Sequence, residues 1–225
     1  MEQKMKVKLL NFTPKPDLTV YLAARVCYSK VGIEELEEEI SDERVKKLIR
    51  KVVMSGHHSV LEHAYFTFGV EGVSRVTTHQ LVRHRIASYS QQSLRWVDAK
   101  DMEVVVPPSI LERPEALMLF NEAIEKTREV YDKLLRIGVP KEDARFVIPQ
   151  GISSKIVFSM NARELHHFFR LRLCTRAQWE IRELARLVLA EVRKVAPIIF
   201  EKVGPPCVME GKCFEEKPCD SPPSL

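Results

Sequence analysis

The densest group of chemically capable side chains surrounds the triplet Arg83-His84-Arg85. Gln80 precedes it, hydroxyl and amide side chains fill 88–93, and Arg95 follows. From residue 72 to residue 97 there is no Asp or Glu, whereas a solvated surface usually mixes both signs. Arginine binds phosphate through paired donors, and the backbone N–H groups of a polar loop can add to such a site. The segment is a candidate anion site, and the alternative is a basic helix end paired with acidic neighbours.

A second cationic group lies between Arg163 and Arg176, where four arginines occur in fourteen residues. Arg163, His167 and Arg170 are spaced i, i+4, i+7 and would share one helix face. Such a stripe could bind nucleic acid, which makes a nucleic-acid-binding module the main alternative function. Single-strand binding would need exposed aromatic rings, and the adjacent Phe168 and Phe169 are more typical of a core.

Cys174 could be an activated thiolate, because it lies between two arginines and His166 could serve as its base. A cysteine-nucleophile transferase is therefore a further alternative, although free cysteines are more often small buried side chains. Cys207, Cys213 and Cys219 are separated by five residues each, which differs from the CxxC pairing of a zinc ribbon. We expect no metal site and a flexible tail.

Histidines cluster again in the segment GHHSVLEH at 56–63. It is not the HExxH of a metalloprotease, and it follows a predicted helix rather than lying within one. Either His63 is satisfied by hydrogen bonds in a loop, or an imidazole packs against a flat cofactor. The chain has neither GxGxxG nor a Walker A motif, so side chains and ordinary helix or loop N–H groups must hold any nucleotide.

The elements that must position these groups belong to one compact domain. The chain has 225 residues, 45% of them hydrophobic, a net charge of +4 and a mean hydropathy of −0.17. It contains no apolar run of the ~20 residues that span a bilayer, and no secretory signal, so we expect a soluble cytoplasmic protein.

Apolar spacing predicts strands at 6–10, 64–70, 103–107 and 155–160. Helices are expected from Asp17 as a cap, from Ser41 or Asp42 to Gly56, from Ser74 through the RHR triplet, at 115–137, from Asn161 as a cap, and at 177–195. Residues 57–63 and 88–93 are expected as a connection and a loop. This pattern predicts an α+β fold with a largely antiparallel central sheet wrapped by helices, in a single domain over 1–203 with a tail at 204–225.

The triplet at 83–85, seven further residues and Ser93 resemble the RHR-x7-S motif of the flavin-dependent thymidylate synthases. The segment 56–63 resembles the family's upstream GH-x4-EH. Ala144-Arg145, NAREL at 161–165 and LRLCTRAQWEI at 171–181 resemble later family segments in the same order. The resemblance extends over roughly residues 5–203.

The resemblance implies reductive methylation of dUMP to dTMP. The carbon donor would be 5,10-methylenetetrahydrofolate, the hydride source FAD reduced by NADPH, and the released product tetrahydrofolate. It also implies a homotetramer with active sites shared between subunits, and neither nucleic acid nor membrane as a partner.

The resemblance implies a role for each matching residue. Arg172 would be the catalytic residue beside the uracil. The dUMP-binding residues would be Gln80, Leu81, Val82, Arg83, Gln91, Gln92, Ser93, Leu94, Arg95, Arg145 and Arg172. The FAD-binding residues would be Ser59, Arg83, His84, Arg85, Gln91, Asn161, Ala162, Arg163 and His167. His57, Glu62 and His63 would line the flavin pocket.

Overall fold

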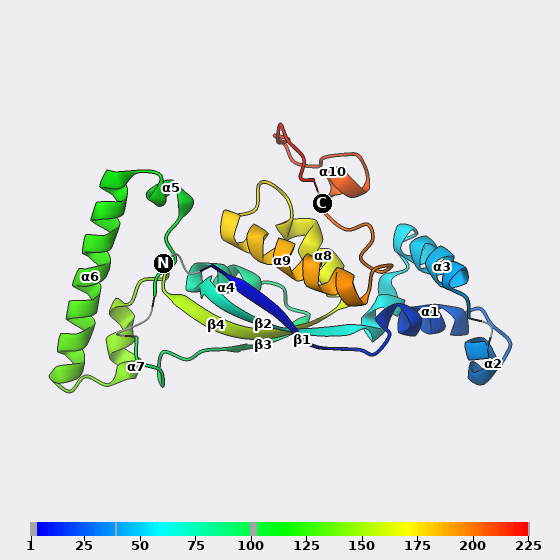
Figure 1. Ribbon diagram of the computed structural model, residues 1–225, viewed down its shortest axis with the longest axis horizontal. Coiled ribbons are helices and arrows are strands. Elements are labelled where there is room, and N and C mark those ends of the chain that lie inside the picture. The colour runs from blue at the N-terminus through cyan, green and yellow to red at the C-terminus, as the bar shows by residue number, and fades with distance from the viewer. Residues whose placement is uncertain (1–3, 39, 100–102, 225) are drawn as a thin grey trace. The chain divides into compact units, whose positions relative to one another are not determined.

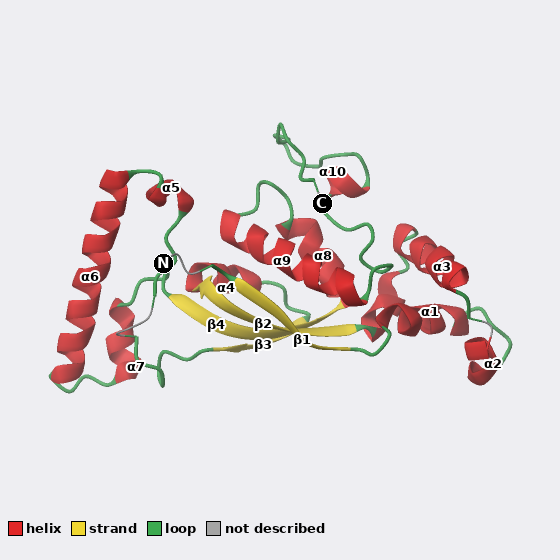
Figure 2. Cartoon of the chain, in the orientation of Figure 1, coloured by secondary structure: helices red, strands yellow, loops and turns green. Residues whose placement is uncertain are grey.

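The computed structural model describes residues 4–38, 40–99 and 103–224 (Figure 1). Its strands form one antiparallel sheet in the order β1-β2-β4-β3, and helices accompany it, which confirms the α+β fold class (Figure 2). The strands are β1 Lys6–Phe12, β2 Tyr65–Ser74, β3 Ala87–Gln91 and β4 Ser153–Asn161. The predicted strands at 6–10, 64–70 and 155–160 are therefore confirmed.

The helical elements include three long helices expected from their apolar spacing, α3 Asp42–Met54, α6 Pro114–Arg136 and α9 Trp179–Val195. Ser41 caps α3 by accepting a hydrogen bond from the Arg44 N–H, as predicted. Among the described residues, no helix is both long and apolar enough to cross a lipid bilayer. The helical elements are α1 Pro16–Val26, α2 Ile33–Glu38, α3 Asp42–Met54, η1 His58–His63, α4 Arg75–Leu81, α5 Pro108–Leu111, α6 Pro114–Arg136, α7 Lys141–Ala144, η2 Arg145–Val147, α8 Ala162–Arg172, α9 Trp179–Val195 and α10 Pro206–Met209.

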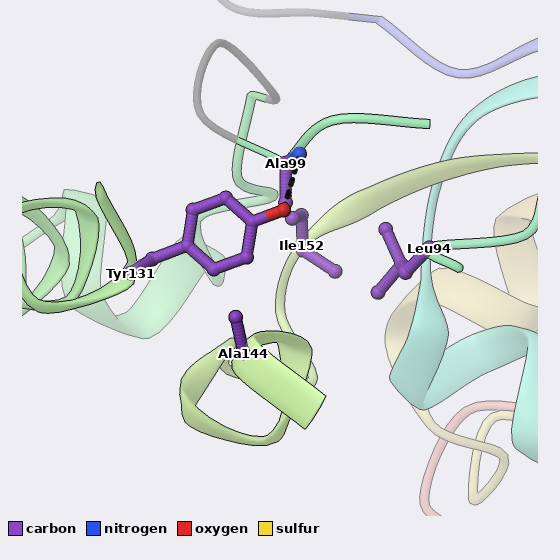
Figure 3. Packing of buried hydrophobic residues seen from close by; sticks show 5 residues of the cluster. All are labelled: Leu94, Ala99, Tyr131, Ala144 and Ile152. Atoms are coloured by element: carbon purple, nitrogen blue, oxygen red, sulfur yellow. Dashed lines mark hydrogen bonds between the residues drawn. The ribbon is translucent and has the colours of Figure 1, made fainter. Parts of the chain in front are cut away.

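The chain divides into two compact units. The first unit comprises the residues up to Lys6, Val70–Leu81 and Ser90–Ile156. A buried cluster of Leu94, Ala99, Tyr131, Ala144 and Ile152 packs within it (Figure 3). The hydroxyl oxygen of Tyr131 also accepts a hydrogen bond from the Ala99 N–H at 3.4 Å. This cluster joins the long helix α6 to the chain that follows β3.

The second unit comprises Val7–Gly69, Val82–Tyr89 and the chain from Val157 onward. Its core is aromatic. Phe66 of β2 lies 5.5 Å from Phe200, and Phe200 lies 5.9 Å from Phe169 of α8, measured between ring centroids. Phe68 stacks on Phe158 of β4 at 4.9 Å. Each fully buried ring stabilises the fold by about 1.5–3 kcal/mol, so α8 is held firmly in this unit.

The predicted helix through the RHR triplet is wrong in its end point. Ser74 does act as its cap, accepting from the Thr77 N–H at 3.1 Å, but α4 ends at Leu81. Residues 82 and 83 form a turn, because the next side chain, His84, is drawn into the second unit's interior.

The expected loop at 88–93 and the expected strand at 103–107 are also corrected. Residues 87–91 form the edge strand β3, and pairing continues with Gln92 N–H donating to the Lys155 carbonyl at 2.9 Å. The described residues 103–107 form no strand but a single isolated bridge, between Val104 and Ile152. A Cβ at Gly151 would lie 3.3 Å from a Val104 methyl group, so this close approach favours glycine.

Two smaller expectations differ as well. Residues 58–63 form a 3-10 helix instead of an irregular connection. Asp17 does not cap α1, whose N-cap is Lys15 in the left-handed conformation at φ 47°. The Asp17 carboxylate instead accepts from the N–H groups of Ile198 at 3.2 Å and Ile199 at 3.0 Å. Helix α1 therefore anchors the segment that follows α9.

We expect Asp17→Ala to destabilise the protein by about 1–3 kcal/mol, because two partly buried N–H groups would lose their acceptor. Urea unfolding followed by tryptophan fluorescence measures the change. Glu122→Ala, which removes an exposed carboxylate of α6, is the control and should change stability by less than about 0.5 kcal/mol. Equal stabilities for the two variants would contradict the anchoring role.

Candidate active site

A buried chain of polar side chains centres on His84. Its Nδ1 lies 3.0 Å from Oε1 of Glu164, and its Nε2 lies 3.1 Å from Nε of Arg172. A guanidinium can only donate, so Nε2 of His84 must accept, and the ring proton must reside on Nδ1. His84 then donates that proton to the Glu164 carboxylate. Arg172 therefore fixes the direction of both hydrogen bonds that His84 makes.

Burial sets the charge of this chain. The pKa of His84 is lowered to about 4, first by burial and then by the positive charges of Arg172 and His167. Burial raises the pKa of Glu164, an effect that nearby His167 partly offsets. Burial also lowers the pKa of Arg172. His84 is therefore a neutral imidazole near pH 7, which is the form that the two hydrogen bonds require.

Helix α8 presents the residues that enclose the imidazole. Glu164, Phe168 and Arg172 are spaced i, i+4, i+8, so they lie along one helix face. The Phe168 ring meets the His84 ring edge-on at 5.0 Å. Asn161 caps the helix, as predicted, by accepting from the Glu164 N–H at 2.9 Å. Because the helix start is fixed in this way, the three side chains are aligned on His84.

The backbone of His84 is fixed too. The Tyr89 hydroxyl donates to the His84 carbonyl at 2.7 Å, and burial raises the pKa of that hydroxyl. The tyrosine therefore stays protonated and remains a donor. This bond closes the turn that carries Arg83 and Arg85, whose side chains are exposed.

His84, Glu164 and His167 have ligand atoms within 4.8 Å of one another, which raises the question of a metal ion. Nε2 of His84 accepts from Arg172, and Nδ1 faces Glu164, so neither ring nitrogen has a lone pair to offer an ion. The guanidinium beside the group would also repel a cation. Its chemistry favours an anionic or electron-rich ligand.

A separate pocket of about 410 Å³ brings together several residues expected to contact FAD. Its lining includes His57 and Ser59 from the GHHSVLEH segment and Arg163 from α8. Arg163 forms an ion pair with the exposed carboxylate of Glu62. His63 is exposed at the end of η1. The pocket offers a cation, imidazoles and a hydroxyl to a ligand.

The first unit contains a second group of predicted residues. The Gln91 amide donates to the hydroxyls of Thr78 at 3.0 Å and Ser154 at 3.2 Å. Arg95 forms an ion pair with Glu142 at 2.8 Å, and its guanidinium lies 5.4 Å from the centre of the Trp96 ring. The predicted residue Leu94 packs in the core cluster, so its side chain anchors the segment.

Arg75 belongs to the same unit and was missed as a site residue. Its Nη1 is buried and finds no hydrogen-bond partner in the described part of the chain. Burial and the charge of Arg145 lower its pKa. An unpaired buried guanidinium nitrogen beside a second arginine marks a place for an anion. The acid-free stretch at 72–97 includes Arg75, but only its burial distinguishes it from the other arginines.

The predicted residues fall in both units. The first unit holds Gln80, Leu81, Gln91, Gln92, Ser93, Leu94, Arg95 and Arg145. The second holds His57, Ser59, Glu62, His63, Val82, Arg83, His84, Arg85, Asn161, Ala162, Arg163, His167 and Arg172. Within the second unit, the structure brings His84, His167 and Arg172 together, because Glu164, His167 and Arg172 all lie close to His84.

His166 is a structural histidine. Its Nε2 lies 3.0 Å from the Ile199 carbonyl, and its ring stacks on Phe200 at 5.5 Å. Burial and His58 lower its pKa to about 4. With one nitrogen bonded to the backbone and the ring packed on Phe200, His166 is poorly placed to serve Cys174 as a base.

Comparison with known proteins gives one consistent result. The model of the family described as thymidylate synthase complementing protein matches residues 8–198. A flavin-dependent thymidylate synthase of Clostridium tetani is 48% identical, over 94% of this chain and 91% of the relative. One from Geobacter sulfurreducens is 52% identical with the same coverage, and one from Sulfurisphaera tokodaii is 44% identical over 95% of this chain and 83% of the relative.

Acid should weaken the fold through His84. Between about pH 6.5 and about 4, His84 binds a proton in the unfolded chain but not in the folded one. The contribution of neutral His84 to the free energy of unfolding is therefore complete above that range and is lost as the pH falls through it. The expected loss is on the order of 3 kcal/mol. Glu164, with its raised pKa, opposes part of it, and His166 adds to it.

Urea unfolding at several pH values measures this loss. His84→Asn should show a shallower decline of the unfolding free energy between pH 6.5 and 4 than the unsubstituted protein. His57→Asn replaces an exposed imidazole and controls for the substitution itself. Equal slopes in all three proteins would show that His84 does not carry the acid sensitivity.

Proposed function

The chain belongs to the family of flavin-dependent thymidylate synthases, which are methyltransferases, and on this premise we propose the reaction and the residues that perform it. The substrate is dUMP, the carbon donor is 5,10-methylenetetrahydrofolate, and the products are dTMP and tetrahydrofolate. FAD, reduced by NADPH, supplies the hydride when it is bound. The relatives' shared name supports the flavin, and the chemistry of the two arginine groups supports the anionic ligands.

The observation that carries the proposal is the restraint of Arg172 by His84. Nε of Arg172 is engaged by the imidazole at 3.1 Å, which orients the plane of the guanidinium. Its two terminal amino groups are then directed together toward a ligand. To accept carbon at C5, uracil must gain electron density, and negative charge then develops over N3 and the adjoining carbonyl oxygens. A planar pair of donors facing that edge stabilises the developing charge.

The first unit supplies the groups for the dUMP phosphate. Arg75 has a buried nitrogen without a partner, and Arg145 lies close enough to lower its pKa. A phosphate near both arginines would satisfy the orphaned donor and relieve the repulsion between the two cations. Arg95, Ser93 and Gln91 of the segment after β3 complete this group in the proposal.

The second unit supplies the groups for FAD. The pocket lined by His57, Ser59 and Arg163 offers donors for the pyrophosphate and an apolar wall from Ala24 and Val52. Asn161 and Ala162 are buried at the start of α8, next to Arg163, and are assigned to FAD in the proposal. His84, Arg85 and His167 are assigned to the same cofactor, with Glu62 and His63 at its margin.

The structure weakens the two rival functions. A single-strand nucleic-acid surface needs exposed rings between its arginines, but Phe168 and Phe169 are fully buried. A cysteine nucleophile at Cys174 needs a base, and His166 is committed to the Ile199 carbonyl. Salt-dependent polynucleotide binding by a colourless protein would favour the first rival over a flavoenzyme.

We also propose that the active enzyme is a homotetramer with sites shared between subunits, working in the cytoplasm. Large apolar side chains are exposed at Tyr28, Trp96 and Phe146. Contact with other subunits would cover them in the proposed tetramer.

Arg172→Lys should retain FAD and much of the dUMP affinity but lose about 2–4 kcal/mol of transition-state stabilisation. Lysine keeps the charge, but it cannot bond His84 and present two coplanar donors at the same time. The measurement is single-turnover methylation with pre-reduced flavin and saturating dUMP. Arg186→Lys, which replaces an exposed arginine of α9 paired with Glu183, is the control. An unchanged rate in Arg172→Lys would make Arg172 structural.

Shared sites can be tested by mixing two inactive variants, Arg95→Ala and Arg172→Ala. If one site draws these arginines from different subunits, subunit exchange generates some sites with both arginines intact, and activity returns. We expect recovery after mixing under exchanging conditions and none for either variant alone. Absence of recovery, with exchange verified by mass, would contradict sharing of this pair.

A further inference from the structure

Four of the five cysteines converge although they are far apart in sequence. Cys174 follows α8, Cys207 lies in α10, and Cys213 and Cys219 lie in the chain beyond it. All four line one pocket of about 400 Å³ and are partly buried free thiols. The fifth, Cys27, is exposed and lines a different pocket.

Ion pairs hold the tail that brings three of these cysteines to the fourth. Arg170 of α8 binds Glu210 at 2.6 Å, and Arg176 binds Glu215 at 3.5 Å. Arg176 also donates to the backbone carbonyl of Lys217. The tail expected to be flexible thus docks on the connection between α8 and α9, and its cysteines face Cys174 across the pocket.

We propose that Cys174, Cys207, Cys213 and Cys219 bind one zinc ion, which fastens the C-terminal tail to the end of α8. Four thiolates in a tetrahedron are a donor set that a structural zinc ion prefers. Each thiol would release its proton to solvent as the metal–sulfur bond forms. The resulting site carries two net negative charges, and two arginines that line the pocket, Arg170 and Arg176, would balance them.

Binding requires the thiols to draw together. In the described part of the chain, the group whose ligand atoms already lie within 4.8 Å of each other is that of His84, Glu164 and His167, not the cysteines. With zinc–sulfur bonds of about 2.3 Å, the sulfurs would come to about 3.8 Å from each other. Three of the four thiols belong to the tail, whose described residues form one short helix, and this segment can close around an ion by side-chain rotation and small backbone shifts.

This site explains why cysteine spacing in the sequence did not predict a metal. A zinc ribbon is recognised by two CxxC pairs, each supplying two ligands from one turn. Here the three tail cysteines are separated by five residues each, and the fourth ligand comes from 33 positions before the first of them. Only the docking of the tail on the α8–α9 connection completes the set of four.

The test is metal content of untagged protein by plasma mass spectrometry, with cobalt substitution to report the ligands. We expect one zinc per chain, and intense d–d absorption typical of tetrahedral thiolate coordination when cobalt replaces it. Cys174→Ser, Cys207→Ser, Cys213→Ser and Cys219→Ser should each lose at least tenfold in zinc affinity. Cys27→Ser is the matched control and should retain zinc and the cobalt spectrum.

Protein stripped of metal by a chelator provides a second measurement if the variants fail to fold. Adding zinc to it should protect the chain after residue 204 from proteolysis. Absence of zinc together with four thiols that react freely with a disulfide reagent, or disulfides among them by mass, would overturn the proposal. Stoichiometric iron would overturn the choice of zinc. Loss of activity in Cys174→Ser alone, with metal retained, would restore the nucleophile hypothesis.

Discussion

The hydrogen-bonded chain Glu164–His84–Arg172 is the interaction on which the candidate site depends. The side chains of its first two members are 6% and 2% exposed, so each polar atom needs its partner. Removing any one member would leave the next one buried and unsatisfied, which costs more than the net value of the bond itself. The chain therefore acts as a unit. It also links the orientation of Arg172 to the aromatic core. Two phenylalanines of α8 make this link, since Phe168 packs edge-on against His84 and Phe169 packs edge-on against Phe200.

Features of the fold set by neighbours in sequence could be predicted from the sequence. The caps Ser41, Ser74 and Asn161 act as expected because each bonds an N–H only three residues away. Helix α6 agrees with the expected 115–137 because its apolar spacing alone determines which face is buried. The absence of acidic residues from 72–97 was likewise visible in the sequence, and anion binding by this segment stays a prediction.

The features that were wrong or missed depend on distant partners. Helix α4 stops before the RHR triplet because His84 pairs with Glu164, 80 positions later. Glu164 was not among the predicted site residues, and only its long-range partner shows where the carboxylate points. Asp17 anchors N–H groups more than 180 positions away. Arg75 differs from the other arginines only in the burial of one nitrogen, which is a property of the packed first unit.

The orientation of Arg172 is restrained from two directions. On one side the His84 imidazole holds its Nε. On the other, Arg172 is the last residue of α8, and a helix end frays unless something binds its carbonyls and the chain beyond. Here Arg182 donates to the Thr175 carbonyl at 2.6 Å, and the tail is tied to Arg170 and Arg176. The family match ends at residue 198, so part of what steadies this arginine comes from a tail outside it. A substitution that detaches the tail would therefore loosen the end of α8. Its effect on the reaction would come from a less well oriented Arg172 guanidinium and not from the loss of a residue that contacts the ligand.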